Sequence, residues 1–267
     1  MDDILRDMPA PGVCRLTLNR PDALNALAYS TYEALISQLE AVRFDPTIQV
    51  VILTGAGRAF CAGHDLRSGG SPSWVAEGQG KAQASRAILA KLGNIPLLMR
   101  SLPQPVIAAV NGVTAGAGYS LALAADIAIA ARSARFVNAF HNAGTGHELG
   151  LSYLLPRAIG AQRAAELLLT GRPVPAEEAA AIGLVLRMVE DDRLADEALA
   201  LAAAIQANSP IGIALTKQTL WLNADAGSLQ AAIELENRAI FISQSTEDTA
   251  EKRKAFFEKR APVFVGR

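Results

Sequence analysis

Two glycine-rich turns, each placed directly after an apolar run, are the segments of this sequence best suited to chemistry. The first, residues 53–66, reads LTGAGRAFCAGHDL, and the second, residues 110–120, reads VNGVTAGAGYS. A helix that begins after such a turn leaves N–H groups without partners, and small residues let a ligand approach the backbone closely. Two such turns side by side could direct two N–H donors at one oxygen atom. That arrangement is an oxyanion hole.

Other uses of glycine-rich turns fit this sequence poorly. Neither turn reads G-x-G-x-x-G after a first strand with the expected acidic residue, which argues against dinucleotide binding. Neither contains the Lys-Ser/Thr pair of a P-loop. The His, Cys and Asp residues have no metal-ligand spacing, so no metal is expected. Cys61 has no evident basic partner, which argues against a nucleophilic role.

The elements that must position these turns alternate between strands and helices in the first half of the chain. Residues 13–18 alternate in polarity, with Cys14, Leu16 and Leu18 on one face of a predicted strand. Strands that are separated by helices indicate crossover units and hence an α/β fold. Unbroken apolar runs, typical of strands covered on both faces, occupy residues 50–53, 106–110 and 127–130.

The predicted helices follow from apolar residues at helical spacing. Residues 32–39 show this spacing, so we expect a helix that is capped by Ser30 or Thr31. It should run to about Phe44. From about Ala161 onward the sequence is rich in Ala and Leu and predicts mostly helix.

One segment, residues 67–81, fits neither pattern. It holds four Gly, three Ser and one Pro between two well-patterned stretches. It is either a disordered surface loop or a mobile wall of a pocket.

The bulk composition narrows the class of protein. The 267 residues are 51% apolar, with a net charge of -1 and a pI near 6.3, so neither nucleic acid nor an acidic membrane is expected as a partner. Two cysteines cannot form a disulfide framework and fit a reduced cytosol. No signal peptide or membrane span is expected, because the N-terminus lacks a basic start and the apolar stretches are interrupted. We therefore expect a cytoplasmic metabolic enzyme.

An ordered set of motifs along nearly the whole chain resembles the crotonase (enoyl-CoA hydratase/isomerase) superfamily. The resemblance implies an α/β fold: a crotonase-like spiral of ββα units with a C-terminal helical region. It places the active site in residues 1–200 and a trimerisation region in residues 201–267, with trimers that commonly pair into hexamers. Coenzyme A would be part of the substrate, so no separate cofactor is expected. The matching segments are residues 18–27, 57–66, 105–118, 124–130, 169–185 and 255–260.

The same resemblance assigns the oxyanion donors. They are the backbone N–H groups of His64 and Ala117. The family normally has Gly at the second position, but alanine keeps its N–H group. The His64 ring would only pack or cap, because the donor is the backbone.

The resemblance also implies a set of substrate-contacting residues. Coenzyme A would meet residues of the N-terminal segment and the first turn, and the acyl group would meet the second turn and its surroundings. Two C-terminal residues would reach coenzyme A across subunits, unless they belong to an ordinary amphipathic helix. The set comprises Leu24 and Ala26 in the CoA channel, Ala62 at the adenine, Asp65, Leu66 in the pocket, Gly116, Ser120, Phe140, Phe256 and Lys259.

The proton-transfer acid is the point at which this sequence departs from hydratases. Hydratases of the family use two glutamates to place and activate water, and here those positions carry Ser120 and Phe140. Neither residue is a carboxylate base, which argues against hydration by two glutamates.

Glu148 offers a different carboxylate. Its position resembles the one that carries Asp or Glu in enoyl-CoA isomerases, dienoyl-CoA isomerases and the ring-epoxide isomerase of phenylacetate degradation. Residues 130–136 and 154–157 look closest to the last of these. Glu148 also precedes a predicted helix, where an acid is favoured by the helix dipole alone. Burial would raise its pKa and the helix would lower it.

Three functions therefore stay open. The leading hypothesis is an enoyl-CoA isomerase in which Glu148 moves a proton between two carbons of the enolate. The second is a hydratase-like lyase that positions water with Ser120 and Glu148, and the third is an acyl-CoA binder without catalysis. The oxyanion motifs favour an enzyme. His141 and His147 either line the acyl pocket or are ordinary surface or core imidazoles.

Overall fold

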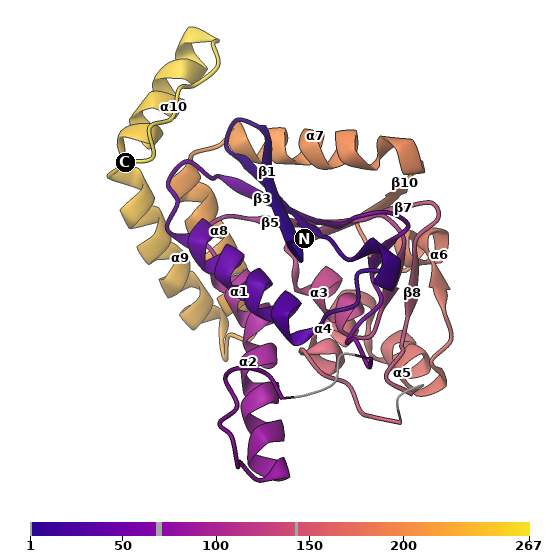
Figure 1. Ribbon diagram of the computed structural model, residues 1–267. Coiled ribbons are helices and arrows are strands. Elements are labelled where there is room, and N and C mark those ends of the chain that lie inside the picture. The colour runs from indigo at the N-terminus through magenta and orange to yellow at the C-terminus, as the bar shows by residue number, and fades with distance from the viewer. Residues whose placement is uncertain (1, 68–70, 142–143) are drawn as a thin grey trace.

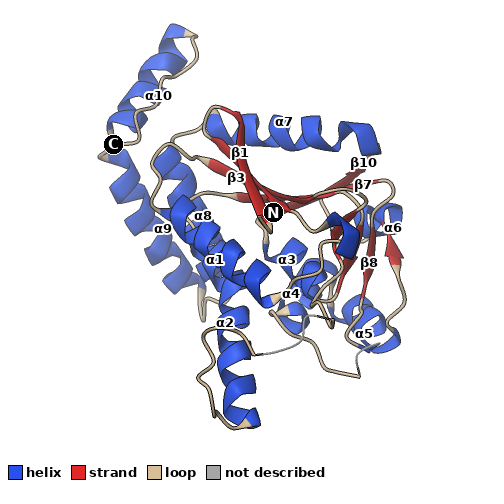
Figure 2. Cartoon of the chain, in the orientation of Figure 1, coloured by secondary structure: helices blue, strands red, loops and turns tan. Residues whose placement is uncertain are grey.

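The computed structural model describes residues 2–67, 71–141 and 144–267 (Figures 1 and 2). Its largest sheet has six strands in the order β1-β2-β3-β5-β7-β10. The β1–β2 pair is antiparallel, and every later pair in this sheet is parallel. The strands are β1 Ile4–Ala10, β2 Val13–Leu18, β3 Val50–Gly55, β5 Val106–Val110, β7 Ile127–Ala131 and β10 Arg187–Val189.

A second sheet has four strands in the order β4-β6-β8-β9. Its strands are β4 Ala59–Cys61, β6 Val113–Ala115, β8 Arg135–Val137 and β9 Val174–Pro175. Three consecutive pairs, β3/β4, β5/β6 and β7/β8, each send one strand to the first sheet and the next to the second. A helix follows each pair. This repeat is the ββα spiral that the sequence resemblance implied.

Helices cover both faces of the six-stranded sheet, with α7 on one face and α1 and α3 on the other (Figure 1). Among the described residues, two short helices are of the 3₁₀ type, η1 Pro21–Ala23 and η3 Asp191–Arg193. The α-helices are α1 Tyr29–Arg43, α2 Lys81–Ser101, α3 Ala117–Ala124, α4 Leu151–Ile159, α5 Ala161–Thr170, α6 Ala176–Ala181, α7 Leu194–Gln206, α8 Pro210–Asn223, α9 Leu229–Gln244 and α10 Glu247–Glu258.

The polarity pattern of the strands decides which residues enter which core. In β2, Cys14, Leu16 and Leu18 join the larger cluster as predicted, while Val13 joins a smaller cluster under α7. The unbroken run in β3 divides in the same way, because successive side chains point to opposite faces of a sheet. The prediction of strands that are covered on both faces is confirmed.

The predicted cap of the first helix is wrong. The helix begins at Tyr29, its N-cap is Ala28, and no side chain caps it. The hydroxyls of Ser30 and Thr31 instead donate to Asp3 Oδ2, at 2.8 and 2.6 Å. They therefore tie the start of the helix to the N-terminal segment. The predicted end near Phe44 is confirmed, because Phe44 is the C-cap.

The C-terminal helices extend away from the sheets, and α10 lies far from α3 and α4 (Figure 2). Helix α9 buries none of its residues in this single chain. Within the described residues, no single helix is long and apolar enough to cross a membrane. One bent pair, residues 191–206 with 210–223, meets that test by length and composition only.

Candidate active site

The first residue of α3 carries one free backbone donor. Gly116 precedes the helix with a φ of 50°, and its carbonyl accepts from Tyr119 N at 3.0 Å and from Ser120 N at 3.3 Å. The N–H of Ala117 itself has no partner among the described residues. A Cβ at Gly118 would lie 2.3 Å from Cys61 O, so only glycine lets α3 pack this closely on β4.

The second free donor comes from an isolated bridge between two extended segments. Leu27 N donates to Gly63 O at 2.7 Å, and Asp65 N donates to Leu27 O at 3.0 Å. Because bonding groups alternate along extended backbone, the N–H of His64 points away from Leu27. Within the described ranges it has no partner.

The two turns meet at Gly63, as predicted. A Cβ at Gly63, whose φ is 96°, would lie 2.9 Å from Ala115 O and 3.4 Å from Ala117 N. The free N–H of His64 follows directly in the chain. Two unpartnered donors thus lie side by side, as an oxyanion hole requires.

The expectation that the first turn begins a helix is wrong. Strand β4 lies within residues 53–66, and His64 lies in the bridge to Leu27. The next helix, α2, begins only at Lys81. The donor is therefore free because it sits in a single-residue bridge, whereas that of Ala117 is free because it begins a helix.

The ring of His64 packs against aromatic side chains, which fits a donor that acts through its backbone. Its centroid lies 5.4 Å from that of Tyr29 and 5.9 Å from that of Tyr32, which stacks on it. Burial lowers the pKa of His64, so the ring is neutral at neutral pH. The sequence patterns placed Tyr32 only on the apolar face of a helix and gave no sign that it meets His64.

Trp74 of the glycine-rich segment lies in these surroundings, and the role of the segment as a pocket wall stays a prediction. Trp74 meets the Tyr29 ring edge-on at 5.7 Å, and Lys91 Nζ lies 4.0 Å from the centre of the Trp74 ring. Residues 68–70 of the predicted segment lie outside the described residues.

Glu148 lies in a tightly held turn before α4. Ser120 Oγ, on α3, donates to the backbone carbonyl of Glu148 at 3.0 Å. The next two residues, Leu149 and Gly150, have φ values of 55° and 77°, and the left-handed conformation is unfavourable for a leucine. A strained backbone of this kind persists only where its surroundings hold it. Here Leu149 is buried, and α3 anchors the preceding carbonyl.

Burial decides the electrostatics of Glu148. It raises the pKa of this carboxyl. The charge of Glu148 in turn helps raise the pKa of the buried Tyr32 hydroxyl, after burial itself, which places the carboxylate near the ring that stacks on His64. That the acid and both donors serve one site stays a prediction.

The other acid in the predicted set, Asp65, is engaged in structure. Its carboxylate accepts from Arg20 Nη2 at 2.8 Å and from Arg67 N at 3.0 Å. These contacts tie the first turn to the N-terminal segment. The side chain of Leu66 is 77% exposed, so its lining of the pocket stays a prediction.

The predicted contacts to coenzyme A lie on a short stretch of backbone. Ala62 N donates to Leu24 O at 3.0 Å, which joins the first turn to the N-terminal segment. The Ala26 carbonyl accepts from Arg20 Nη1 at 2.6 Å. Leu24 is left-handed, with a φ of 52°, and its N–H bonds to Pro21. Binding of coenzyme A at these residues stays a prediction.

Phe140 and His147 pack together beside the acid. Their rings meet edge-on at 5.6 Å, and Asn138 Nδ2 lies 3.2 Å from His147 Nε2. Burial, then the charge of His141, lower the pKa of His147. His141 is exposed and bonds the carbonyl of Leu168. A lining role is therefore favoured for His147 over His141.

The remaining predicted residues are a buried cysteine near the site and two residues at the end of α10, away from it. Cys61 is fully buried, and burial raises the pKa of its thiol to about 12, which agrees with no nucleophilic role. Phe256, which is 77% exposed, and Lys259 lie at the end of α10, away from the site in the same chain (Figure 1). Their contact with coenzyme A, which would need a second subunit, stays a prediction.

Comparison with known proteins agrees with this geometry. A probable enoyl-CoA hydratase from Mycobacterium tuberculosis is 46% identical over 264 residues, covering 98% of this chain and 92% of that protein. The 1,2-epoxyphenylacetyl-CoA isomerase of Escherichia coli is 40% identical over 259 residues, covering 96% of each. The crystal structure of a probable enoyl-CoA hydratase/isomerase from Mycobacterium abscessus superposes with a TM-score of 0.93 at 38% identity and covers 100% of both chains. The family model for enoyl-CoA hydratase/isomerase matches residues 9–267. The chain belongs to the enoyl-CoA hydratase/isomerase family.

Proposed function

We propose that this enzyme moves the double bond of an enoyl-CoA thioester, with Glu148 as the proton carrier. The thioester oxygen accepts hydrogen bonds from the N–H groups of His64 and Ala117. Glu148 removes a proton from one carbon, the negative charge spreads to the thioester oxygen, and the same carboxyl returns the proton to a second carbon. No water is added, and the products differ from the substrate only in the position of the double bond.

The observation that carries this proposal is the position of Glu148. It is a part-buried carboxyl with a raised pKa, near the ring that stacks on His64, and α3 holds its backbone. A general base works best when its pKa approaches the working pH, and burial moves Glu148 in that direction. Asp65, the other acid of the predicted set, is paired with Arg20.

Hydration is the second candidate, because several relatives are named hydratases. In this alternative Ser120 and Glu148 would hold the attacking water together. The Ser120 hydroxyl already donates to the Glu148 carbonyl, so it could offer the water only its lone pairs. Because the Ser120 proton is already donated, Ser120 is less able to position a water molecule, and this favours isomerisation over hydration. A binder without catalysis would have no need for two aligned N–H donors.

Product analysis separates the candidates. Purified enzyme would be incubated with 3-hexenoyl-CoA and, separately, with 2-hexenoyl-CoA in ¹⁸O-labelled water, and the products resolved by chromatography and mass spectrometry. We expect the double bond to move without gain of mass. Rapid formation of ¹⁸O-labelled 3-hydroxyacyl-CoA would favour the hydratase. Binding without any product from either substrate would favour the binder.

We also propose that residues 201–267 mediate self-association into trimers or hexamers. Helix α9 buries nothing in the single chain, and α9 and α10 expose large apolar side chains that water does not favour. Light scattering after size exclusion would give the mass, and a monomer at micromolar concentration would contradict this proposal. The exposed residues are Leu229, Ile233, Ile240, Phe241, Ile242, Phe256 and Phe257.

A further inference from the structure

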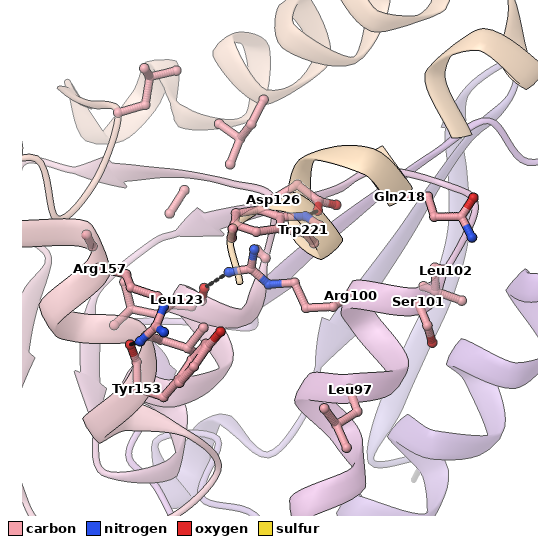
Figure 3. Close-up of a pocket in the computed structure, with 18 of the residues that line it drawn as sticks. Leu97, Arg100, Ser101, Leu102, Leu123, Asp126, Tyr153, Arg157, Gln218 and Trp221 are labelled. Atoms are coloured by element: carbon pink, nitrogen blue, oxygen red, sulfur yellow. Dashed lines mark hydrogen bonds between the residues drawn. The ribbon is translucent and has the colours of Figure 1, made fainter. Parts of the chain in front are cut away.

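A hollow between α2, α4 and α8 lies outside the candidate active site (Figure 3). It has a volume of about 890 Å³, and Arg100 lies against the ring of Trp221 at its wall. Helix α8 belongs to residues 201–267, for which we propose self-association, so this hollow belongs with that contact between subunits. Neither Glu148 nor His147 lines it.

The turn that carries Glu148 is held against the helix that begins with a free donor. Ser120 Oγ donates to the carbonyl of Glu148 at 3.0 Å, and Ser120 lies about one helical turn after Ala117. His147 directly precedes Glu148 and is half-buried. Its ring meets that of Phe140 edge-on, with the centroids 5.6 Å apart. His147 is therefore the chain neighbour of the proposed proton carrier, on the turn that α3 holds.

A buried amide fixes the position of the proton on His147. Asn138 Nδ2 donates to the Leu168 carbonyl at 2.8 Å and lies 3.2 Å from His147 Nε2. A carbonyl oxygen only accepts, so the amide atom on this side is the nitrogen, since exchange of the two amide atoms would set oxygen against oxygen. The atom that faces Nε2 is thus a donor, and Nε2 has to accept. A neutral His147 therefore carries its proton on Nδ1.

The same contact keeps the ring of His147 neutral. A second proton would sit on Nε2 and face the N–H of Asn138, which sets two donors against each other. Asn138 is 3% exposed, so water does not relieve that conflict. Burial, followed by the charge of His141, also lowers the pKa of His147.

The Nδ1–H of His147 is a donor without a partner in the described part of the chain. The two nitrogens of an imidazole point in widely different directions, so this N–H is turned away from the buried amide. A donor that is fixed in both position and tautomer favours a ligand that accepts a hydrogen bond. A plain hydrocarbon chain at this place would leave the N–H unpaired, which costs free energy.

We propose that the Nδ1–H of His147 donates a hydrogen bond to an oxygen on the acyl chain. The substrate would then be an enoyl-CoA whose chain bears an ether, hydroxyl or oxo group beyond the double bond. This assignment rests on the proposed function, which places the acyl chain beside Glu148. His147 selects the acyl group, and Asn138 is a positioning residue that fixes the donating tautomer.

Ethers make matched probes, because an ether oxygen accepts a hydrogen bond and cannot donate one. 6-Methoxy-3-hexenoyl-CoA has the length of 3-octenoyl-CoA, and 7-methoxy-3-heptenoyl-CoA has the length of 3-nonenoyl-CoA. Each pair differs only in an oxygen for a methylene group, and the two ethers place that oxygen at different depths. Isomerisation by the full-length enzyme at neutral pH gives the ether-to-hydrocarbon ratio of kcat/KM for each pair.

His147→Phe removes the donor and keeps a planar ring. The ether-to-hydrocarbon ratio should fall about 3- to 10-fold for at least one pair, the magnitude of one hydrogen bond between neutral groups. His141→Phe is the matched control, because His141 is exposed and already bonds the Leu168 carbonyl. It should leave both ratios within about twofold. If His147→Phe fails to fold, His147→Leu provides the same comparison.

The tautomer is measured without turnover. The chain has three histidines, so nitrogen-15 NMR of histidine-labelled protein can resolve each ring. His147 should show a protonated Nδ1 and a bare Nε2 at neutral pH. Its Nδ1 resonance should shift more on binding 6-methoxyhexanoyl-CoA, a saturated ether, than on binding octanoyl-CoA.

The proposed function and the role of His147 fail in different ways. Tighter binding of the saturated ether that is lost in His147→Phe, with no isomerisation of any probe, would reject the isomerase and keep the role of His147. Isomerisation of all four enoyl thioesters with the same ratios in the parent and in His147→Phe would keep the isomerase and overturn the role of His147. A proton found on Nε2 of His147 would overturn it as well.

Discussion

Ser120 and Glu148 lie 28 positions apart and are joined by a hydrogen bond of 3.0 Å from Ser120 Oγ to the Glu148 carbonyl. By the sequence resemblance, Ser120 occupies a position at which hydratases of the family carry a glutamate. Here a short hydroxyl occupies that position and anchors the turn that carries a different acid. Ser120 therefore offers no carboxylate base, and its hydroxyl holds the backbone of Glu148.

We predict that Ser120→Ala lowers turnover about 3- to 30-fold and costs about 1 kcal/mol of folding free energy. The loss of one hydrogen bond to a buried carbonyl has that magnitude, and a loosened turn lets Glu148 leave its productive geometry. Isomerisation rates and chemical unfolding would measure the two effects. KM should change little, because Ser120 acts through Glu148.

A double-mutant cycle shows whether Ser120 acts through the acid. If it does, Ser120→Ala in a Glu148→Gln background should reduce the residual rate by little more than Glu148→Gln alone. A full, independent loss in that background would instead show that Ser120 contacts the substrate directly.

The pH dependence of isomerisation follows from the raised pKa of Glu148. The base must be ionised to take a proton, so kcat should rise with pH through the pKa of Glu148 in the complex. Because burial raises that pKa, the acidic limb should lie above the ordinary glutamate value of 4.5. A kcat profile whose acidic limb lies at or below pH 4.5 would contradict this assignment.

The two oxyanion donors should respond differently to substitution. His64→Ala keeps the backbone N–H, so it should retain much of the activity. It should cost about 1–2 kcal/mol of stability, because the ring packs on Tyr29 and Tyr32. Ala117→Pro removes the N–H at the start of α3, and loss of one donor costs about 10²–10³ in turnover.

Steady-state rates measured beside thermal unfolding would separate loss of function from loss of fold. A folded His64→Ala enzyme with no activity would show that the ring itself is catalytic. Near-normal turnover in Ala117→Pro would exclude that N–H as a donor.

The sequence predicted the strands of the core because they depend on local pattern, whereas the meeting of the two turns followed from the family resemblance. The alternating polarity of β2 predicts one buried face, and the unbroken apolar run of β3 predicts two buried faces, as the structure shows. The N-cap of α1 was missed because Ser30 and Thr31 bond Asp3, a residue far away in the chain. Propensity alone cannot reveal a partner 27 or 28 positions distant.

Local sequence pattern likewise cannot reveal the long-range contacts of the candidate active site. The stacking of Tyr32 on His64 joins α1 to the turn after β4, and the bond from Ser120 to Glu148 joins two ββα units. Neither contact leaves a pattern in the residues near it. The sign of the pKa shift at Glu148 was open for the same reason, since burial depends on the whole fold.

The test that decides most is Glu148→Gln. Glutamine keeps the size and hydrogen-bonding capacity of the side chain but cannot accept a proton, so isomerisation should fall about 10²–10⁴-fold. Acyl-CoA binding, measured by titration with a saturated thioester, should persist, because both N–H donors lie elsewhere. Asp65→Asn is a matched carboxyl-to-amide control that removes a structural ion pair and should lower stability more than chemistry.

Stability gives a second readout of the same variant. Because burial raises the folded-state pKa of Glu148, ionising it at neutral pH costs folding free energy. The charge is absent in Glu148→Gln, so this variant should unfold at the same temperature as the parent or higher at pH 8, with less advantage at pH 5. Near-normal turnover in a folded Glu148→Gln enzyme would reduce Glu148 to an acid that precedes a helix. The proton carrier would then have to be sought at Asp65, or the chain taken as an acyl-CoA binder.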